Sequence, residues 1–254
     1  MTVPTAVDPT RIEGAVAVVT GASRRIGRQT ALGLASHGAD VVVTARSAKD
    51  EIEAVADEIR ALGRKATVVM ADVTSQDDVA RLAETVRAEH GRADILVNNA
   101  AVRKQAPLLE MSFEEWKQIN SVVLDGAFLT CQALLPLMIE TGGGTVVNIG
   151  GMTGHTGAPN RAHVCTAKAG IVGFTKALTV EFADRGITAN CLVPGHIGGA
   201  RSASAGAAPA HGDGPLGRAG TVEEAAAMVV ALCLPQAGYM TGQTVHVSGG
   251  LYMP

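Results

Sequence analysis

A turn that contains two glycines and two adjacent arginines follows an apolar run near the start of this chain. The run Ala15–Thr20 is rich in β-branched residues, which is typical of a buried parallel strand, and it leads into the turn Gly21–Gly27. The apolar spacing after the turn predicts a helix, and the free N–H groups at a helix start attract an anion. A nucleotide pyrophosphate suits this place, although glycines at this spacing also form tight turns in purely structural loops.

The end of the second predicted strand carries a cation where the ribose of a nucleotide would lie. The strand Ala39–Thr44 is followed by Ala45 and Arg46. An acidic residue at such a strand end binds the ribose hydroxyls, whereas a guanidinium neutralises a 2′-phosphate through paired hydrogen bonds. Arg46, with Arg24 as a second clamp, therefore favours NADP(H) over NAD(H). The alternative is that Arg46 is a solvated loop residue.

Charged and titratable side chains also gather on a predicted helix that contains Lys168. At about 100° per residue, Lys168 shares a face with Val164 and Arg161, Cys165 lies at the edge of that face, and His163 lies on the opposite side. An arginine holds its proton too firmly to donate it, but it stabilises an oxyanion. Cys165 is either a proton donor or a packed small apolar side chain.

Two histidines follow the ends of predicted strands. His155 comes after the strand Thr145–Ile149, and His196 comes after the strand Thr188–Val193. Because parallel strands end at the same edge of a sheet, both are expected near one cleft, where a histidine is a proton donor close to neutral pH. The alternative for His155 is an exposed loop histidine without a role.

Four motifs together resemble the short-chain dehydrogenase/reductase family, most of all its 3-oxoacyl carrier-protein reductases. They are TGASRRIG at 20–27, NNAA at 98–101, the segment VVNIGGMTGHTGAPNRAHVCTAKAG at 146–170, and PGHI at 194–197. The resemblance covers nearly the whole chain and implies a dinucleotide-binding oxidoreductase. The residues assigned to the cofactor, Arg24 and Arg46 included, are Gly21, Ser23, Arg24, Arg25, Ile26, Gly27, Arg46, Asp72, Val73, Asn99, Ala100, Lys168, Pro194, Gly195 and Ile197.

The same resemblance places unusual residues at the catalytic positions. Counting back four residues from Lys168 puts Val164 where the family has its Tyr, and Gly151 stands where it has its Ser. In the family the Tyr exchanges a proton with the substrate, the Ser binds the carbonyl, and the Lys lowers the pKa of the Tyr and holds the ribose. Here the ribose-binding role of Lys168 is retained, and Arg161 stands where the enoyl reductases of the superfamily place their Tyr.

Further positions complete the expected site. Arg25 replaces a family Gly, as in pteridine reductases, and Gly199 replaces a Thr. Asn120 resembles the Asn that kinks its helix and holds a water in a proton relay; the alternative is a hydrogen-bonded core amide. The candidate catalytic residues are Asn120, Lys168, His155 and Arg161, and we expect weak activity on ordinary ketones because both hydroxyls are missing.

Strands that alternate regularly with helices predict an α/β fold, a single-domain Rossmann-type doubly wound parallel sheet of seven strands flanked by helices, over residues 1–254. Capping patterns predict helix starts at Ser47 with Asp50, Ser112 with Glu115, and Thr221 with Glu224. The small-residue segment Ala200–Gly214 is expected to be a lid over the substrate.

Composition narrows the class of partner. The chain has 254 residues, 47% hydrophobic residues and a formal net charge of −3, which argues against nucleic acid or an anionic membrane as the main partner. We expect no apolar stretch long enough to span a bilayer. The four cysteines lack metal-ligand spacing, so we expect no metal site and free thiols in a reducing cytoplasm. A homo-tetramer is expected because relatives of this type are usually tetramers and the apolar tail Leu251–Met253 suits burial in a neighbour.

The sequence therefore favours an NADP(H)-dependent oxidoreductase acting on a carbonyl, an imine or a related small-molecule substrate. Two alternatives stay open. One is a nucleotide-sensing or assembly subunit without turnover, and the other is a non-redox enzyme, such as a hydrolase or lyase, in the same cleft.

Overall fold

Seven parallel strands form the centre of the molecule. The computed structural model describes residue 10, residues 12–199 and residues 214–254. The strands are β1 (Val16–Thr20), β2 (Asp40–Ala45), β3 (Ala66–Met70), β4 (Ile95–Asn98), β5 (Gly144–Ile149), β6 (Ile187–Pro194) and β7 (Thr244–Val247). Their order in the sheet is β3-β2-β1-β4-β5-β6-β7, which confirms the predicted seven-stranded α/β fold. The direction of winding reverses between β1 and β4, where doubly wound folds bind their ligands.

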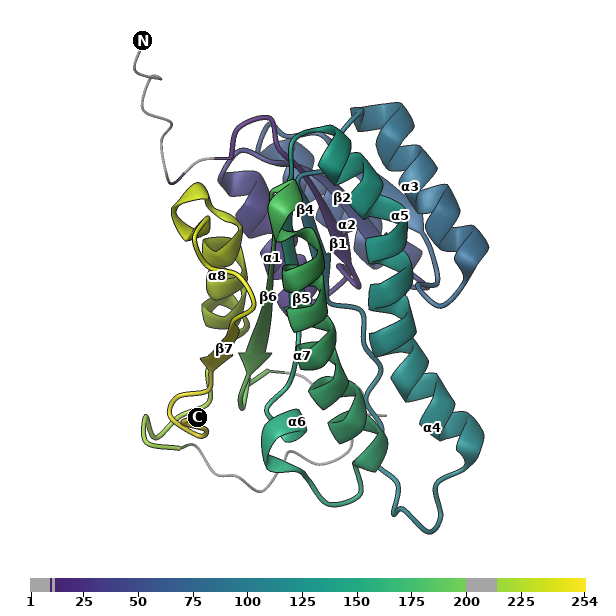
Figure 1. Ribbon diagram of the computed structural model, residues 1–254, viewed down its shortest axis with the longest axis vertical. Coiled ribbons are helices and arrows are strands. Elements are labelled where there is room, and N and C mark those ends of the chain that lie inside the picture. Colours follow the sequence, from purple (N-terminus) through teal and green to yellow (C-terminus); the bar gives the residue numbers. More distant parts are fainter. Residues whose placement is uncertain (1–9, 11, 200–213) are drawn as a thin grey trace.

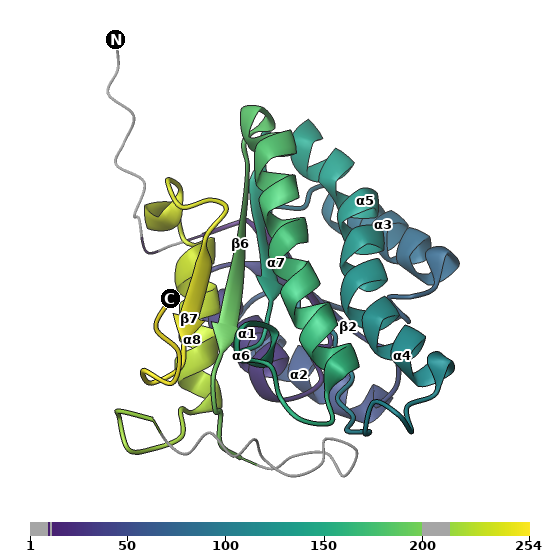
Figure 2. The same ribbon diagram turned by 60° about the horizontal axis from the view of Figure 1, so that its bottom comes forward.

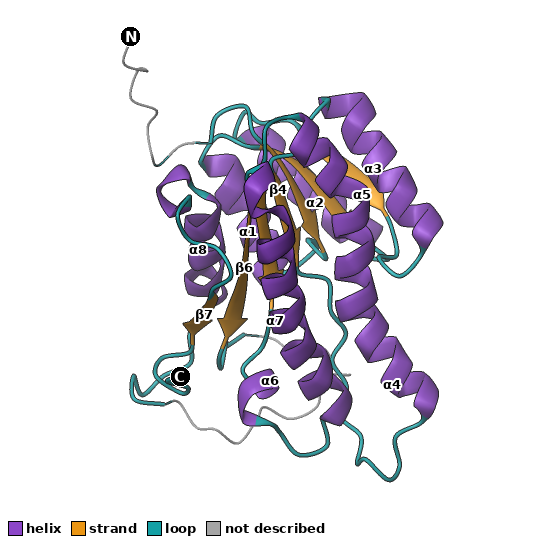
Figure 3. Cartoon of the chain, viewed as in Figure 1, coloured by secondary structure: helices purple, strands orange, loops and turns teal. Residues whose placement is uncertain are grey.

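Helices cover both faces of the sheet (Figures 1 and 3). They are α1 (Arg25–Ser36), α2 (Lys49–Ala61), α3 (Gln76–His90), α4 (Phe113–Asn120), α5 (Gly126–Glu140), α6 (Thr153–Thr156), α7 (Ala162–Phe182) and α8 (Val222–Cys233). The shorter turns are the π-helix η1 (Ser121–Asp125) and the 3₁₀ helices η2 (Ala183–Arg185) and η4 (Pro235–Ala237). Helices α1, α2 and α8 share one apolar core with the sheet, and α3, α5 and α7 share another.

The central strand shows why the sequence folds in this way. All five residues of β1 are buried, as a parallel strand covered on both faces requires. Ala17 and Val19 pack into the core of α1, α2 and α8, whereas Val16 and Val18 pack into the core of α3, α5 and α7. A continuous β-branched run, rather than an alternating one, is the sequence pattern of such a strand.

Two of the three predicted helix starts are confirmed. The Ser112 hydroxyl accepts a hydrogen bond from the Glu115 N–H at the start of α4, and Thr221 and Glu224 form a full capping box at the start of α8. The prediction at Ser47 is wrong: α2 begins after Ala48, which has a left-handed φ of 67°, and no side chain caps it. The predicted lid lies outside the described residues except for Gly214.

The helical run Phe113–Glu140, which comprises α4, η1 and α5, is long and apolar enough to cross a membrane, contrary to the expectation from sequence. The core helix of a folded domain passes the same test, and 56% of the apolar stretch is buried inside this protein. In both views α5 lies beside α3, between the sheet and solvent (Figures 1 and 2). Its apolarity is therefore explained by packing within the fold.

Four buried polar side chains connect the sheet to α5 and α7. The Thr130 hydroxyl donates to Asn98 at 2.7 Å, Asn98 donates to Asn148 at 2.9 Å, and Asn148 donates to Thr175 at 2.9 Å. Asn98 and Asn148 are neighbours in the register of β4 and β5. A buried network in which each member has a partner fixes the relative placement of its elements, here the ends of the two strands below the site.

Candidate cofactor and active site

Hydrogen bonds from the residues at the end of β4 fix the turn after β1. The Asn99 side chain donates to the carbonyl oxygens of Thr20 and Gly21, both at 2.9 Å, and the backbone N–H groups of Asn99 and Ala100 donate to the Thr20 hydroxyl at 3.0 Å. A Cβ on Gly27 would lie 2.4 Å from Asn99 Nδ2, so only glycine fits there. These hydrogen bonds and close contacts fix the expected anion-binding turn between the ends of β1 and β4 and the start of α1.

Arg25 occupies this turn in a conformation that favours glycine. Its φ is 52°, and its guanidinium donates to the carbonyl oxygens of Ile197 at 3.3 Å and Gly198 at 3.0 Å. A Cβ on Gly199 would lie 3.2 Å from Arg25 Nη1. The Arg25 side chain therefore occupies space next to Gly199 that a larger residue at position 199 would approach. It also links the two loops that flank the cleft.

The end of β2 carries the predicted ribose-binding cation. Arg46 Nη1 lies 3.6 Å from Asp72 Oδ2, and the Arg46 side chain is more than half exposed. Burial alone would raise the pKa of Asp72, but hydrogen bonds from Thr74 and the nearby Arg46 outweigh it and hold that pKa below its usual value. The buried Thr44 hydroxyl beside them has no hydrogen-bond partner among the described residues. The exposed guanidinium of Arg46 can donate paired hydrogen bonds to the oxygens of a phosphorylated ribose, whereas the Thr44 hydroxyl is buried within the protein.

A cavity of about 620 Å³ runs along the carboxyl ends of β1, β2 and β4, at the reversal of strand order. Its lining includes most residues predicted to bind the cofactor: Gly21, Ser23, Arg24, Arg25, Ile26, Arg46, Asp72, Val73, Asn99, Ala100 and Lys168. A second cavity of about 90 Å³ shares Arg25, Ile26 and Lys168 with it and adds Pro194, Gly195 and Ile197. The structure therefore brings the predicted cofactor residues to one cleft, with Gly27 buried behind its turn.

Lys168 is buried at the junction of the two cavities. Its ammonium group donates to the carbonyl oxygen of Ile149 at 2.6 Å. Burial, together with the nearby charge of Arg103, lowers the pKa of Lys168 to about 8. Gly151 and Val164 line the same small cavity, so neither position offers a hydroxyl beside the amine. Arg161 lines it too, from the residue just before α7, and is 5% exposed.

The two predicted histidines lie in different surroundings. His196 lines the small cavity, but His155 is absent from its lining. Instead the His155 ring lies 4.7 Å from that of His246 and 5.3 Å from that of Tyr252, measured between centroids. Burial lowers the pKa of His155. Burial and the nearby charge of His155 also lower the pKa of His246. These contacts place His155 in a ring cluster with β7 and the C-terminal tail.

Asn120 is the last residue of α4, where the long helical run changes from an α-helix to a π-helix. Its side chain donates to the carbonyl oxygen of Trp116 at 2.8 Å, and the π-helix η1 begins at the next residue. A π-helical turn inside an α-helix often marks a functional site. The kink and the water-holding role expected of Asn120 both stay predictions.

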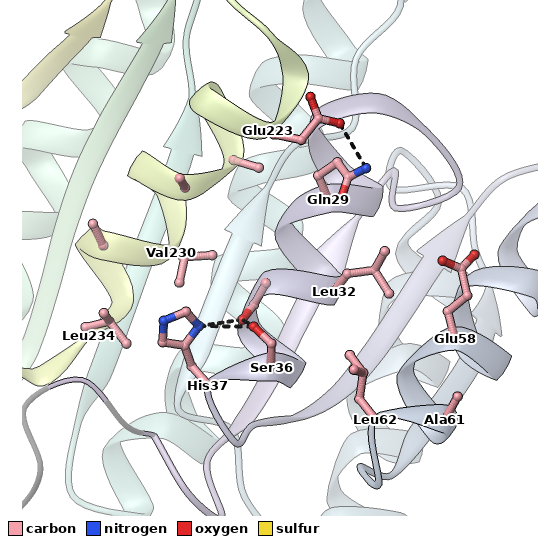
Figure 4. Close-up of a pocket in the computed structure, with 14 residues that line it drawn as sticks. Gln29, Leu32, Ser36, His37, Glu58, Ala61, Leu62, Glu223, Val230 and Leu234 are labelled. Atoms are coloured by element: carbon pink, nitrogen blue, oxygen red, sulfur yellow. Dashed lines mark hydrogen bonds between the residues drawn. The ribbon is translucent and has the colours of Figure 1, made fainter.

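The largest cavity among those described lies elsewhere. It measures about 800 Å³ and is lined by α1, α2 and α8, with mainly small and apolar side chains (Figure 4). Gln29 donates to Glu223 across one end of it at 3.2 Å. None of the cofactor residues lines this cavity, and it lies away from the carboxyl ends of the strands, so we assign the chemistry to the two cavities described above.

Comparison with known proteins agrees with this fold. The family model described as enoyl-(acyl carrier protein) reductase matches residues 21–252. This chain belongs to the short-chain dehydrogenase/reductase family. It is 40% identical over 245 residues to a 3-oxoacyl-[acyl-carrier-protein] reductase of Synechocystis, covering 96% of this chain and 99% of the relative. A reductase of the same name from Escherichia coli is 38% identical, covering 95% and 98%.

Solved structures of this family superpose closely on the chain. A short-chain type dehydrogenase/reductase from Mycobacterium marinum gives a TM-score of 0.88 at 37% identity, covering 97% of this chain and 98% of that one. A putative short-chain alcohol dehydrogenase from Sinorhizobium meliloti gives 0.89 at 31% identity, covering 95% and 98%. The short-chain dehydrogenase/reductases are oxidoreductases that use nicotinamide cofactors, and this chain is an oxidoreductase of that family.

Sequence reasoning missed one residue that lines the site, Arg103, and two residues that hold His155 away from it, His246 and Tyr252. Arg103 lines both cavities and lowers the pKa of Lys168. Its position just after NNAA, at the carboxyl end of β4, was a usable signal. His246 and Tyr252, which hold the His155 ring, could not be found in this way because they come from β7 and the tail, distant in sequence.

Proposed function

We propose that this chain is an NADP(H)-dependent oxidoreductase that reduces a carbonyl or imine group of a small molecule, with Lys168 in place of the missing hydroxyls. The observation that carries the proposal is the shared cavity, which is lined by the three arginines at positions 24, 25 and 46 and also by Lys168. The first group suits the phosphates of the cofactor, and the second suits the reacting end.

Each cofactor residue takes a role that its place supports. Arg24 and Arg46 bind the 2′-phosphate, and Asp72 and Val73 lie against the adenine. The turn N–H groups and Arg25 bind the pyrophosphate, while Asn99 and Ala100 form the wall of the cleft. Lys168 binds the nicotinamide ribose, and the backbone of Pro194, Gly195 and Ile197 binds the carboxamide.

The reduced nicotinamide supplies a hydride to the electrophilic carbon. The substrate oxygen or nitrogen then needs a proton, and the Lys168 ammonium provides it. With a pKa of about 8, this group donates more readily near neutral pH than an ordinary lysine. The hydrogen bond to Ile149 orients the amine. Arg161 stabilises the developing negative charge, and Asn120 holds a water that returns a proton to Lys168.

A second candidate is a nucleotide-binding protein without turnover. It is favoured by the positions of Gly151 and Val164, which line the cavity beside Lys168 without a hydroxyl. Loss of a general acid and an oxyanion donor costs roughly 10²–10⁴ and 10²–10³ in rate. The two candidates differ in one measurable property, the oxidation of NADPH.

The test is NADPH oxidation against a panel of ketones and imines, with wild type, Lys168→Met and a control, Arg60→Gln, on the outer side of α2. We expect turnover that declines above about pH 8 as Lys168 loses its proton, and a loss of roughly 10²-fold or more in Lys168→Met. NADPH binding without oxidation of any compound overturns the proposed reaction in favour of the second candidate. Full turnover in a Lys168→Met variant overturns the role of Lys168.

We also propose a homo-tetramer in the cytoplasm. Phe113 and Phe128 expose apolar rings on α4 and α5, and β7 is an edge strand with every residue half-buried. Exposed apolar surface and an unpaired strand edge favour association. Light scattering after gel filtration measures the mass, and a monomer would contradict the tetramer.

A further inference from the structure

Lys168 is a buried residue whose side chain borders open space. It is 6% exposed, yet it lines both the cavity of about 620 Å³ and the small cavity of about 90 Å³. Gly151 places no side chain over the stem of the lysine, because a Cβ there would lie 3.2 Å from Lys168 Cγ. A small molecule that enters the cleft can therefore reach Lys168, although little of this residue is in contact with bulk solvent.

The amine of Lys168 has no carboxylate beside it in the part of the chain that the structure describes. Its hydrogen bond goes to the carbonyl oxygen of Ile149 at 2.6 Å. Asp72 is the one described acidic residue in the lining of either cavity, and its carboxylate lies 3.6 Å from the guanidinium of Arg46. A buried ammonium group without a carboxylate is unfavourable relative to the neutral amine. The surroundings of Lys168 thus favour loss of its proton.

The groups around the amine determine how much of it is neutral. Burial and the charge of Arg103 lower the pKa of Lys168 to about 8, and Cys191 acts in the opposite direction. Burial raises the pKa of Cys191 itself to about 11, so this thiol keeps its proton at pH 7. With a pKa of about 8, about one protein molecule in ten holds the neutral amine at pH 7. For a lysine with an ordinary pKa, the fraction is below about one in a thousand.

A neutral lysine amine that borders a cavity is the nucleophile of Schiff-base chemistry. The small cavity has room for roughly three water-sized groups, which suits a short aldehyde. Gly151, Met152 and Val164 contribute apolar lining, so an uncharged compound suits this space. We propose that Lys168 binds a small neutral aldehyde covalently, as an imine, when no nicotinamide cofactor is in the cleft. This function needs no cofactor and does not depend on the proposed reduction.

The covalent step is balanced without an oxidant or a reductant. The amine nitrogen attacks the carbonyl carbon and forms a C–N bond, and the proton that the nitrogen releases passes through water to the oxygen. Loss of this oxygen as water then leaves a C=N bond. The carbonyl oxygen of Ile149 holds the amine through one N–H and leaves its electron pair available for the attack. A protonated imine withdraws electrons from the neighbouring carbon, which is the first step of aldol and lyase chemistry.

The test is to trap the imine in the full chain at pH 7. Butanal is added with sodium cyanoborohydride, which reduces an iminium group to a stable amine, and peptide mapping by mass spectrometry follows the labelling of each lysine with time. Lys176, exposed on the same helix α7, is the comparison within the molecule. We expect Lys168 to be labelled at least ten times faster than Lys176. The fast label should be lost in Lys168→Met and kept in Lys176→Met, and saturating NADP⁺ should slow it tenfold or more.

The outcomes separate this inference from the proposed reduction. Fast labelling of Lys168 that NADP⁺ suppresses supports the inference and agrees with the ribose-binding role of the same amine. Fast labelling that NADP⁺ does not suppress supports the inference and contradicts that ribose-binding role. Labelling of Lys168 that is absent, or no faster than that of Lys176, overturns the inference, and NADPH oxidation then tests the reduction separately. Because wild type contains both lysines, this comparison holds even if Lys168→Met fails to fold.

Discussion

The guanidinium of Arg25 donates a hydrogen bond to the carbonyl oxygen of Gly198 at 3.0 Å, which ties the turn after β1 to the loop after β6. These two loops hold opposite ends of the proposed nicotinamide nucleotide. An arginine in a left-handed conformation is strained, and here the strain accompanies a link across the cleft. The link gives the first prediction.

We expect Arg25→Gly to weaken NADPH binding about tenfold while changing the free energy of unfolding by less than about 1 kcal/mol. Glycine relieves the left-handed strain, roughly 1 kcal/mol, which offsets the lost hydrogen bonds to Ile197 and Gly198. Fluorescence titration and urea unfolding measure the two quantities, with Arg60→Gln as control. Unchanged NADPH affinity would show that Arg25 serves the loop contact alone.

Lys168 makes stability depend on pH in a defined direction. Its pKa of about 8 is below that of the unfolded chain, so between about pH 8 and pH 10 the unfolded state binds more protons and stability rises with pH. The gain over this range is about 2 kcal/mol relative to a Lys168→Met variant. Burial raises the pKa of Cys131 and Cys233 to about 12, which acts in the opposite direction.

The measured quantity is therefore the difference in the free energy of unfolding between wild type and Lys168→Met. It is obtained from urea unfolding at pH 8 and at pH 10, without cofactor. The thiols of Cys131 and Cys233 are common to both proteins and cancel, and both proteins carry Cys191→Ala because the charge of Lys168 acts on the Cys191 thiol. A difference that stays constant between the two pH values would contradict the lowered pKa of Lys168.

The ring cluster of His155, His246 and Tyr252 predicts sensitivity to acid. Both histidines have lowered pKa values, so the unfolded chain takes up protons first as the pH falls below about 6.5, and stability is lost. We expect His246→Phe to make unfolding less dependent on pH between 7 and 5. His90 also has a lowered pKa, mainly through burial, so it contributes to the same pH dependence. His90→Gln is therefore measured beside His246→Phe to separate the two contributions. Equal slopes in wild type and His246→Phe would be the contrary result.

Restoring the family hydroxyls tests what the cavity lacks. We expect the double variant Gly151→Ser/Val164→Tyr to gain at least tenfold in reduction of simple ketones, since a positioned general acid contributes roughly 10²–10⁴ in rate. A Cβ on Gly151 would lie 3.2 Å from Lys168 Cγ, the flexible part of that side chain, so a small movement makes room. NADPH-dependent assays compare the double variant with each single one. If a folded double variant binds NADPH but reduces simple ketones no faster, the site lacks more than these two hydroxyls.

Much of the fold followed from local sequence signals. The β-branched runs, the glycine turn and the capping pairs Ser112/Glu115 and Thr221/Glu224 each act over a few residues, so their structural consequence is readable. The start of α2 was mispredicted because Ser47 has the right residue type but the backbone turns at Ala48 instead. A capping pattern shows which side chain has the right type to cap a helix, but it does not show whether the capping hydrogen bond forms.

The site was harder to predict where it depends on contacts between distant segments. His155 follows a strand that ends at the cleft, but its ring lies against His246 and Tyr252, which no local pattern reveals. The pairing of Asn98 with Asn148 depends on the register of β4 and β5. Arg103 and Lys168 influence one another only because the loop after β4 and helix α7 meet at the same cavity.

The central claim is that this cleft holds NADP(H), with Arg24 and Arg46 at the 2′-phosphate. The most direct measurement is a fluorescence titration of the protein with NADPH and with NADH under identical salt and pH. We expect NADPH to bind at least ten times more tightly, and Arg46→Gln to remove most of that difference while leaving NADH affinity unchanged. Equal affinity for the two nucleotides, or tighter binding of NADH, would contradict the account.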